Sequence, residues 1–95
     1  MRKMNKSLEE AARLIDANRL DEAKQLIAGL PELQEDAADC QFLLGKIACR
    51  KQEWGMAVNH FNRTLAIDPE YPSAQAQIDM VNDILGYYTP DMFNP

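Results

Sequence analysis

Apolar side chains recur through almost the whole sequence at the three- and four-residue spacing of an amphipathic α-helix. Residues that stop helices interrupt this pattern at Asn18, at Gly29 and Pro31, and again at Asp68-Pro69. The sequence therefore predicts an all-α fold of five short helices with tight connections, and it excludes a long coiled coil. The five apolar stripes begin at Leu8, Leu20, Cys40, Trp54 and Ala74.

Capping residues predict where two of these helices begin and where the last one ends. Asp36 suits the N-cap of the third helix, and Pro72 suits the first turn of the fifth. Gly86 is expected to end the fifth helix, because glycine is the usual residue just past a helix C-terminus.

Composition narrows the class of protein. A chain of 95 residues, 46% of them hydrophobic, is expected to form one small domain. Its net charge of −5 argues against nucleic-acid binding, which depends on clustered positive charge. No apolar stretch approaches the roughly 20 residues of a membrane span, and no apolar core for a signal peptide follows Arg2, Lys3 and Lys6. Neither nucleic acid nor membrane is an expected partner.

The two cysteines, Cys40 and Cys49, lie nine positions apart within one predicted helix. That separation corresponds to about 13 Å of helical rise and places the thiols on opposite sides, so they are not expected to pair. Free thiols suit a reducing compartment, and the sequence therefore predicts a cytoplasmic location.

The helical pattern repeats once along the chain, at the offset that aligns Leu8 with Phe42, here called the repeat offset. Identity between the two copies is low, but the class of side chain is matched at positions that pack. Gly45 costs up to about 1 kcal/mol relative to alanine inside a helix, and it is tolerable if it lets the helix that carries Ala57 come near. The other aligned pairs are Ala11 with Gly45, Leu20 with Trp54, Ala23 with Ala57, and Ile27 with Phe61.

The second copy, counted from Ala38, resembles a tetratricopeptide repeat (TPR). It departs from the family at Gln41, Ala48 and Thr64, and Pro31 shortens the second helix of the first copy. Residues at consensus packing positions of the two copies include Ala11, Ala23, Ile27, Leu44, Gly45, Trp54, Ala57, Phe61 and Pro69.

The resemblance covers Met4 to about Gly86 and implies a right-handed α-α superhelix. It implies a helical hairpin over residues 4–37, a second over 38–71, a capping helix over 72–86 and a tail over 87–95. The run from Asp83 to Asn94 also resembles the end of short stand-alone bacterial TPR proteins.

Polar side chains occupy the outer face of both terminal helices. The first helix carries Glu10 and Arg13, and the fifth carries Gln75, Asp79 and Asn82, where a neighbouring unit would otherwise pack. Because terminal repeats need polar outer faces, we expect a stand-alone module.

The resemblance implies that the chain binds a peptide segment in a concave groove. Leu8, Phe42 and Met80 are expected to form an apolar floor, and Lys46 and Arg50 a basic pair, although packing of these side chains on one another or under the tail remains the alternative. The full set of predicted groove residues is Leu8, Ala12, Ile15, Asp39, Phe42, Lys46, Cys49, Arg50, Ala76, Met80 and Asp83. The positions of the clamp that grips chaperone C-termini hold none of its residues, because they are Leu8, Ala12, Leu43, Ser73 and Gln77.

The sequence offers no constellation for enzyme chemistry. His60 is the only histidine and is expected on a solvated outer face, the carboxylates are dispersed, and no glycine-rich phosphate loop is present. We therefore expect a non-enzymatic adaptor without metal or cofactor, whose partner is a protein or peptide.

The aromatic tail supports an alternative role in self-association. Tyr87, Tyr88, Met92 and Phe93 are unusual in a disordered tail. They are expected to dock either on the helices of the same chain, which leaves a monomer, or on a second copy, which gives a homodimer.

Overall fold

A computed structural model describes residues 4–31 and 33–88 of the chain, with the backbone alone for Tyr87 and Tyr88. The regular secondary structure of the described part is entirely helical, with no strand, which confirms the all-α prediction. Its elements are α1 (Lys6–Asp16), α2 (Leu20–Ala28), the short 3₁₀ helix η1 (Gln34–Asp36), α3 (Ala37–Arg50), α4 (Trp54–Ile67) and α5 (Ala74–Tyr88).

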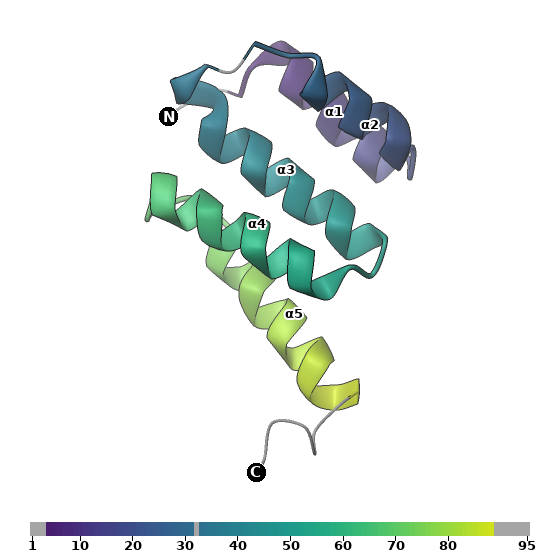
Figure 1. The fold of residues 1–95 in the computed structure, drawn as a ribbon, viewed down its shortest axis with the longest axis vertical. Coiled ribbons are helices and arrows are strands. Elements are labelled where there is room, and N and C mark those ends of the chain that lie inside the picture. Colours follow the sequence, from purple (N-terminus) through teal and green to yellow (C-terminus); the bar gives the residue numbers. More distant parts are fainter. Residues whose placement is uncertain (1–3, 32, 89–95) are drawn as a thin grey trace.

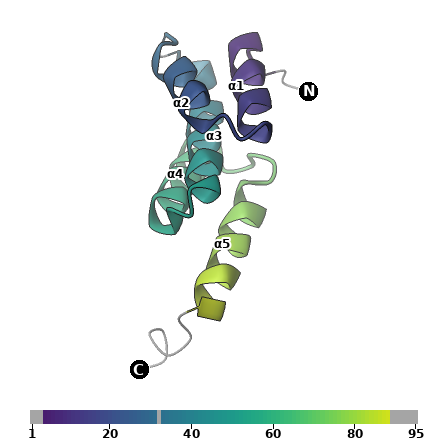
Figure 2. The same cartoon turned by 90° about the vertical axis from the view of Figure 1, so that its right-hand side faces the viewer.

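The helices form two hairpins and a final single helix (Figure 1). Helices α1 and α2 pair with each other, α3 pairs with α4, and α5 packs against α4. Helix α3 also contacts both α1 and α2, so it joins the two hairpins. Seen from the side, α2 and α4 lie on one side of the molecule and α1 and α5 on the other (Figure 2). The result is an elongated body of 45 × 28 × 19 Å.

The turns inside the two hairpins have the same conformation. Asn18 and Gln52, which are related by the repeat offset, have left-handed φ angles of 62° and 60°. In each turn the next residue, Arg19 or Glu53, donates its backbone N–H to a carbonyl five residues earlier at 2.8 Å. This pattern satisfies carbonyls at the end of a helix and reverses the chain. The repeat offset thus relates two equal backbone turns, and the predicted helix end at Asn18 is confirmed.

Two clusters of buried apolar residues form the core, and α3 contributes to both. The first cluster lies between α1, α2 and α3 and includes Leu8, Ile15 and Leu43. The second lies between α3, α4 and α5 and includes Phe61 and Val81. The side chain of Phe42 packs against both clusters, so the core is continuous across the two hairpins.

Most of the residues predicted to pack the repeats lie inside this core. Ala11, Ala23, Ile27, Gly45, Ala57 and Phe61 are buried, and Leu44 and Trp54 are half-buried. Pro69 is exposed, so its assignment to the packed set is wrong. Pro69 follows the end of α4, where its ring prevents the helix from continuing, and this role does not require the ring to be buried against another element.

Gly45 allows a close contact between α3 and α4. A Cβ atom built on Gly45 would lie only 2.5 Å from Cε1 of Phe61, whose side chain is fully buried. The close neighbour of Gly45 is therefore Phe61, one helical turn beyond the Ala57 that the sequence pattern indicates. A side chain at this position would have to displace a ring that is enclosed on all sides.

We expect Gly45→Ala to lower the free energy of unfolding by about 2 kcal/mol. Overpacking costs up to about 3 kcal/mol, and the better helix propensity of alanine offsets up to about 1 kcal/mol of that. The matched control is Gly86→Ala in α5, where no atom lies within 4 Å of the added Cβ, so helix propensity should raise stability. Urea denaturation followed by circular dichroism measures both, and equal stability of the two variants would contradict the contact with Phe61.

Helix ends in the second half of the chain differ from the sequence prediction. Helix α5 begins at Ala74, after Ser73 with a left-handed φ of 69°, so Pro72 lies before the helix rather than in its first turn. The helix runs through Gly86 to Tyr88, and Gly86 does not adopt the positive φ that commonly follows a helix end. Asp36 precedes α3 as predicted but forms no side-chain cap, since η1 leads directly into the helix.

The outer faces of the terminal helices are polar, as predicted. Glu10 and Arg13 are exposed and form an ion pair of 2.9 Å on α1. Gln75, Asp79 and Asn82 are exposed on α5, where the Gln75 amide donates to Asp79 at 3.0 Å. Neither face is covered by another part of the described chain.

Candidate functional site

The predicted groove residues do not form a single accessible surface. Leu8 and Ile15 are fully buried and belong to the first core cluster, so their assignment to the groove is wrong. Helix α1 is packed by both α2 and α3, and Leu8, Ala11 and Ile15 of its apolar stripe are fully buried. The side chains of Leu8 and Ile15 therefore stabilise the fold and cannot contact a ligand.

The other predicted residues differ widely in exposure. Arg50 is exposed and lies 3.8 Å from Asp16 of α1, a loose surface pair that contributes little stability. Met80 is 41% exposed on α5, with exposed neighbours one turn away on the same helix face. By class, Asp39 is buried; Ala12, Phe42, Lys46 and Cys49 are half-buried; Arg50, Ala76, Met80 and Asp83 are exposed.

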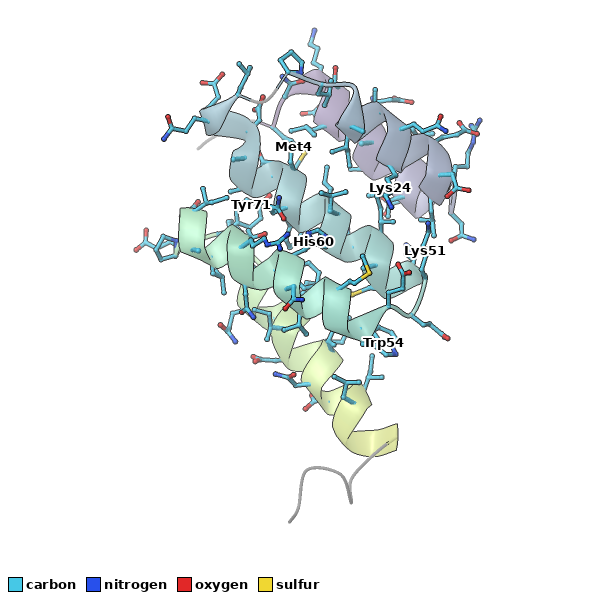
Figure 3. All side chains as sticks on the ribbon, in the orientation of Figure 1. Met4, Lys24, Lys51, Trp54, His60 and Tyr71 are labelled. Carbon is cyan, nitrogen blue, oxygen red and sulfur yellow. The ribbon has the colours of Figure 1, made fainter. Side chains whose placement is uncertain are left out.

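A hollow of about 370 Å³ lies beside the start of α3, and both the α4–α5 connection and Met4, which precedes α1, contribute to its lining. Figure 3 shows Met4 and Tyr71 at this end of α3. Two of the predicted groove residues, Asp39 and Phe42, belong to its wall. The complete lining is Met4, Asp39, Phe42, Asp68, Tyr71, Pro72 and Ser73.

Three aromatic rings connect this hollow with the core. The ring of Phe42 lies 4.9 Å from that of Tyr71, tilted by 39°, and 5.6 Å from that of Phe61, tilted by 53°. Such tilted arrangements contribute about 0.5–1.5 kcal/mol beyond area burial. The Nζ atom of Lys46 lies 5.9 Å from the centroid of Phe42, one turn further along α3. The ring of Phe42 is therefore fixed in position by its neighbours, and it also forms part of the wall of the hollow.

Hydrogen bonds order the polar part of the wall. The Tyr71 hydroxyl donates to Oδ1 of Asp39 at 2.5 Å, and Asp39 is only 4% exposed. A carboxylate at this depth needs such a donor, and the first turn of α3 also favours its negative charge. In the connection, Oδ1 of Asp68 accepts from the N–H of Glu70 at 3.1 Å, and the carbonyl of Asp68 accepts from the N–H of Tyr71 at 3.0 Å. The wall is thus preorganised before any ligand binds.

Sequence reasoning did not identify Tyr71 and Asp68 as site residues. Tyr71 lies between Pro69 and Pro72, and Asp68 directly precedes this connection, where the sequence pattern predicts only the end of one helix and the start of the next. The available signal was a large aromatic residue inside a short proline-bounded connection. Its partner, Asp39, is 32 residues away in the sequence, so no local spacing relates the two.

A second hollow of about 420 Å³ lies at the opposite side of α3, between the end of α2 and the segment that leads into η1. Its wall is mainly apolar, and it includes Leu33, which is 45% exposed. The sequence pattern gave no indication of it, because Gly29 and Pro31 were interpreted only as helix-stopping residues. The lining comprises Ile27, Ala28, Leu30, Pro31, Leu33, Gln34, Ala37, Cys40, Gln41 and Leu44.

His60 does not lie on a solvated outer face, so that prediction is wrong. The side chain is half-buried between α4 and α3, and its Nδ1 is 2.8 Å from Oε1 of Gln41 (Figure 3). Burial, together with the positive charges of Arg63 and of Lys24 from α2, lowers the pKa of His60 below its ordinary value of 6.5. The folded chain therefore favours the neutral imidazole, because packing of α4 against α3 desolvates the ring.

This lowered pKa predicts a loss of stability under mildly acidic conditions. Below pH 6.5 the histidine of the unfolded chain takes up a proton more readily than that of the folded chain, so stability falls as the pH drops through the folded pKa. In the variant His60→Gln the side chain at this position does not titrate, so the free energy of unfolding should lack this part of its pH dependence between pH 7 and pH 5. Thermal unfolding at several pH values measures the difference, and an NMR titration that gives His60 a pKa above 6.5 would contradict the prediction.

The two thiols are free and poorly suited to act as nucleophiles. Burial raises the pKa of both Cys40 and Cys49; the charges of Asp36 and Asp39 raise the pKa of Cys40 further, whereas Lys46 partly offsets the rise at Cys49. The thiolate is the reactive form, and a raised pKa keeps it scarce at neutral pH. Within residues 4–31 and 33–88, no three or more histidine, cysteine or acidic side chains gather as a metal site would require.

None of the helices in the described part of the chain combines the length and the apolar character that crossing a membrane requires. Of the predicted tail residues, Tyr87 and Tyr88 belong to the backbone of α5, and Met92 and Phe93 lie outside the described residues.

Comparison with known proteins gives no assignment for this site. No family model, no curated protein and no solved structure matches the chain significantly.

Proposed function

We propose that this chain is a non-enzymatic interaction module of the TPR type, which binds a peptide segment of another protein. The segment would lie along the face formed by the start of α3, the hollow beside it and the exposed residues of α5. The observation that carries the proposal is the ordered aromatic wall of the hollow, in which Phe42 and Tyr71 are held in position before any ligand binds.

The repeated architecture supports the TPR type. Two helical hairpins turn through Asn18 and Gln52, which share a left-handed conformation and are related by the repeat offset, and α3 packs against the preceding hairpin. Stacked helical hairpins of this kind create extended binding surfaces.

The chemistry of the face supports a peptide ligand. Apolar side chains of a bound segment can be buried against the aromatic rings. The nearby charge of Lys46 would fix the register of the segment along the face. Because Leu8 and Ile15 are part of the core, the apolar floor consists of Phe42, Tyr71 and Met80.

The proposal is tested by selecting binding peptides from a random phage-displayed library on the immobilised chain. Affinities for synthetic copies are then measured by isothermal titration calorimetry. Lys46→Glu and Met80→Asp change side chains at or near the surface and should each weaken binding about tenfold or more, which equals about 1.4 kcal/mol. The matched control, Arg63→Glu, makes the same charge reversal at an exposed position of α4 and should leave affinity unchanged.

Two results would overturn this function. The library could yield no peptide that binds in solution, or Arg63→Glu could weaken binding as much as Lys46→Glu and Met80→Asp do. NMR shifts confined to α2 and α4 on peptide addition would have the same meaning.

The proposal includes a cytoplasmic location for the chain. Cys40 and Cys49 are free and half-buried, as suits a compartment that keeps thiols reduced.

A further inference from the structure

The hollow beside α3 combines aromatic rings with negative charge. Its wall holds the rings of Phe42 and Tyr71 and the carboxylates of Asp39 and Asp68. Among the described residues that line it, none is a lysine, an arginine or a histidine. A peptide can bind to aromatic rings alone, so the added carboxylates indicate a preference for a ligand group of a particular charge.

We propose that this hollow receives the basic side chain of an arginine or a lysine from the bound segment. This inference rests on the proposed function and names the chemistry of the partner. Aromatic faces attract cations through the ring quadrupole, and arginine in particular stacks on them with its planar guanidinium. A carboxylate beside the rings would then accept charge-assisted hydrogen bonds from the same group.

The geometry of the rings suits such a group. The planes of Phe42 and Tyr71 are 39° apart with centroids 4.9 Å from each other, so the two rings meet at an angle at the wall of the hollow. Phe42 already lies near a cation of its own chain, because Nζ of Lys46 is 5.9 Å from its centroid. Lys46 does not line the hollow, and it lies one turn further along α3.

Electrostatics at this end of the molecule favour a positive ligand over a negative one. The starts of α3 and α5 present the positive ends of two helix dipoles, each equivalent to roughly half an elementary charge, and the full negative charge of Asp39 offsets them. Helix α4 ends at Ile67, so its last carbonyls and Asp68 add negative character to the other wall.

The size of the hollow limits what can enter it. A volume of about 370 Å³ is near the lower end of the ~300–1,000 Å³ that small-molecule sites span, so an arginine or lysine side chain fits in it, whereas a large ligand does not.

Small probes test this inference without any selected peptide. The intact chain is titrated with N-acetyl-arginine amide and, separately, with N-acetyl-lysine amide, and backbone amide shifts are followed by NMR. Saturable shifts should appear at Phe42, Tyr71 and their neighbours. N-acetyl-citrulline amide has nearly the shape of the arginine probe but no charge, and it should bind at least about fivefold more weakly.

Matched variants identify the carboxylate that binds the charged probe. Asp68→Asn removes the charge but keeps an oxygen that can accept from the N–H of Glu70, and it should weaken the arginine probe about fivefold. Glu70→Gln removes a charge two residues away that does not line the hollow, and it should leave the affinity unchanged.

The outcomes separate this inference from the proposed function. Equal binding of the citrulline and arginine probes, or no effect of Asp68→Asn, would overturn the inference even if selected peptides bind through Lys46 and Met80. Conversely, charge-dependent probe binding in the hollow would support the inference even if the library yielded no peptide, in which case only the proposed function would fail.

Discussion

Replacement of Phe61 by alanine is expected to lower the free energy of unfolding by about 3–5 kcal/mol, because it leaves a cavity where a large buried ring had been. The ring is fully buried, fills the space above Gly45, and packs with Ile78 and Val81 of α5. Small domains are stable by only about 5–15 kcal/mol, so this loss is a large fraction of the total.

Urea denaturation followed by circular dichroism at 222 nm gives the free energies for this test. The control is Met56→Ala on the same helix, since Met56 is 49% exposed and its truncation should change stability by less than about 1 kcal/mol. A Phe61→Ala variant that loses no more stability than the control would show that α3 and α4 are not packed through this ring.

Leu8→Ala is expected to cost about 2–5 kcal/mol, the range for truncation of a fully buried leucine. Leu8 packs in the cluster that joins α1 to α3, so its loss weakens the attachment of the first hairpin. The same measurement on Met80→Ala provides the comparison, because Met80 is 41% exposed and should lose far less. The difference in free energy of unfolding between Leu8→Ala and Met80→Ala shows which of the two side chains is part of the core.

If Leu8→Ala kept full stability while it weakened the binding of a selected peptide, the assignment of Leu8 to the core would be wrong. The groove predicted from the sequence would then be correct at this position.

Local signals in the sequence predicted the helices well. The left-handed turn at Asn18 and the end of α4 before Asp68-Pro69 depend on the conformational preferences of single residues, and both are present in the structure. The end of α5 was predicted wrongly because glycine permits a helix to end without requiring it to do so. Gly86 is an ordinary helical residue, with no atom within 4 Å of the position that a Cβ would take.

Burial could not be predicted to the same degree, because it depends on neighbours from other elements. Leu8 and Phe42 are matched by the repeat offset, yet Leu8 is fully buried and Phe42 is half-buried. Two helices enclose the stripe of α1 that includes Leu8, whereas Phe42 lies beside an aromatic residue of the α4–α5 connection. The contact between Asp39 and Tyr71 likewise joins residues that share no periodicity.

Because Phe42 packs against both apolar clusters, the central helix should be the last part of the molecule to open. Amide protons in the middle of α3 are then expected to exchange with solvent only when the whole chain unfolds, whereas those of α1 and of the second half of α5 can exchange through local opening. The rings that form the wall of the hollow would thus be anchored to the slowest-exchanging segment, and the helices beside it would be free to adjust around a ligand.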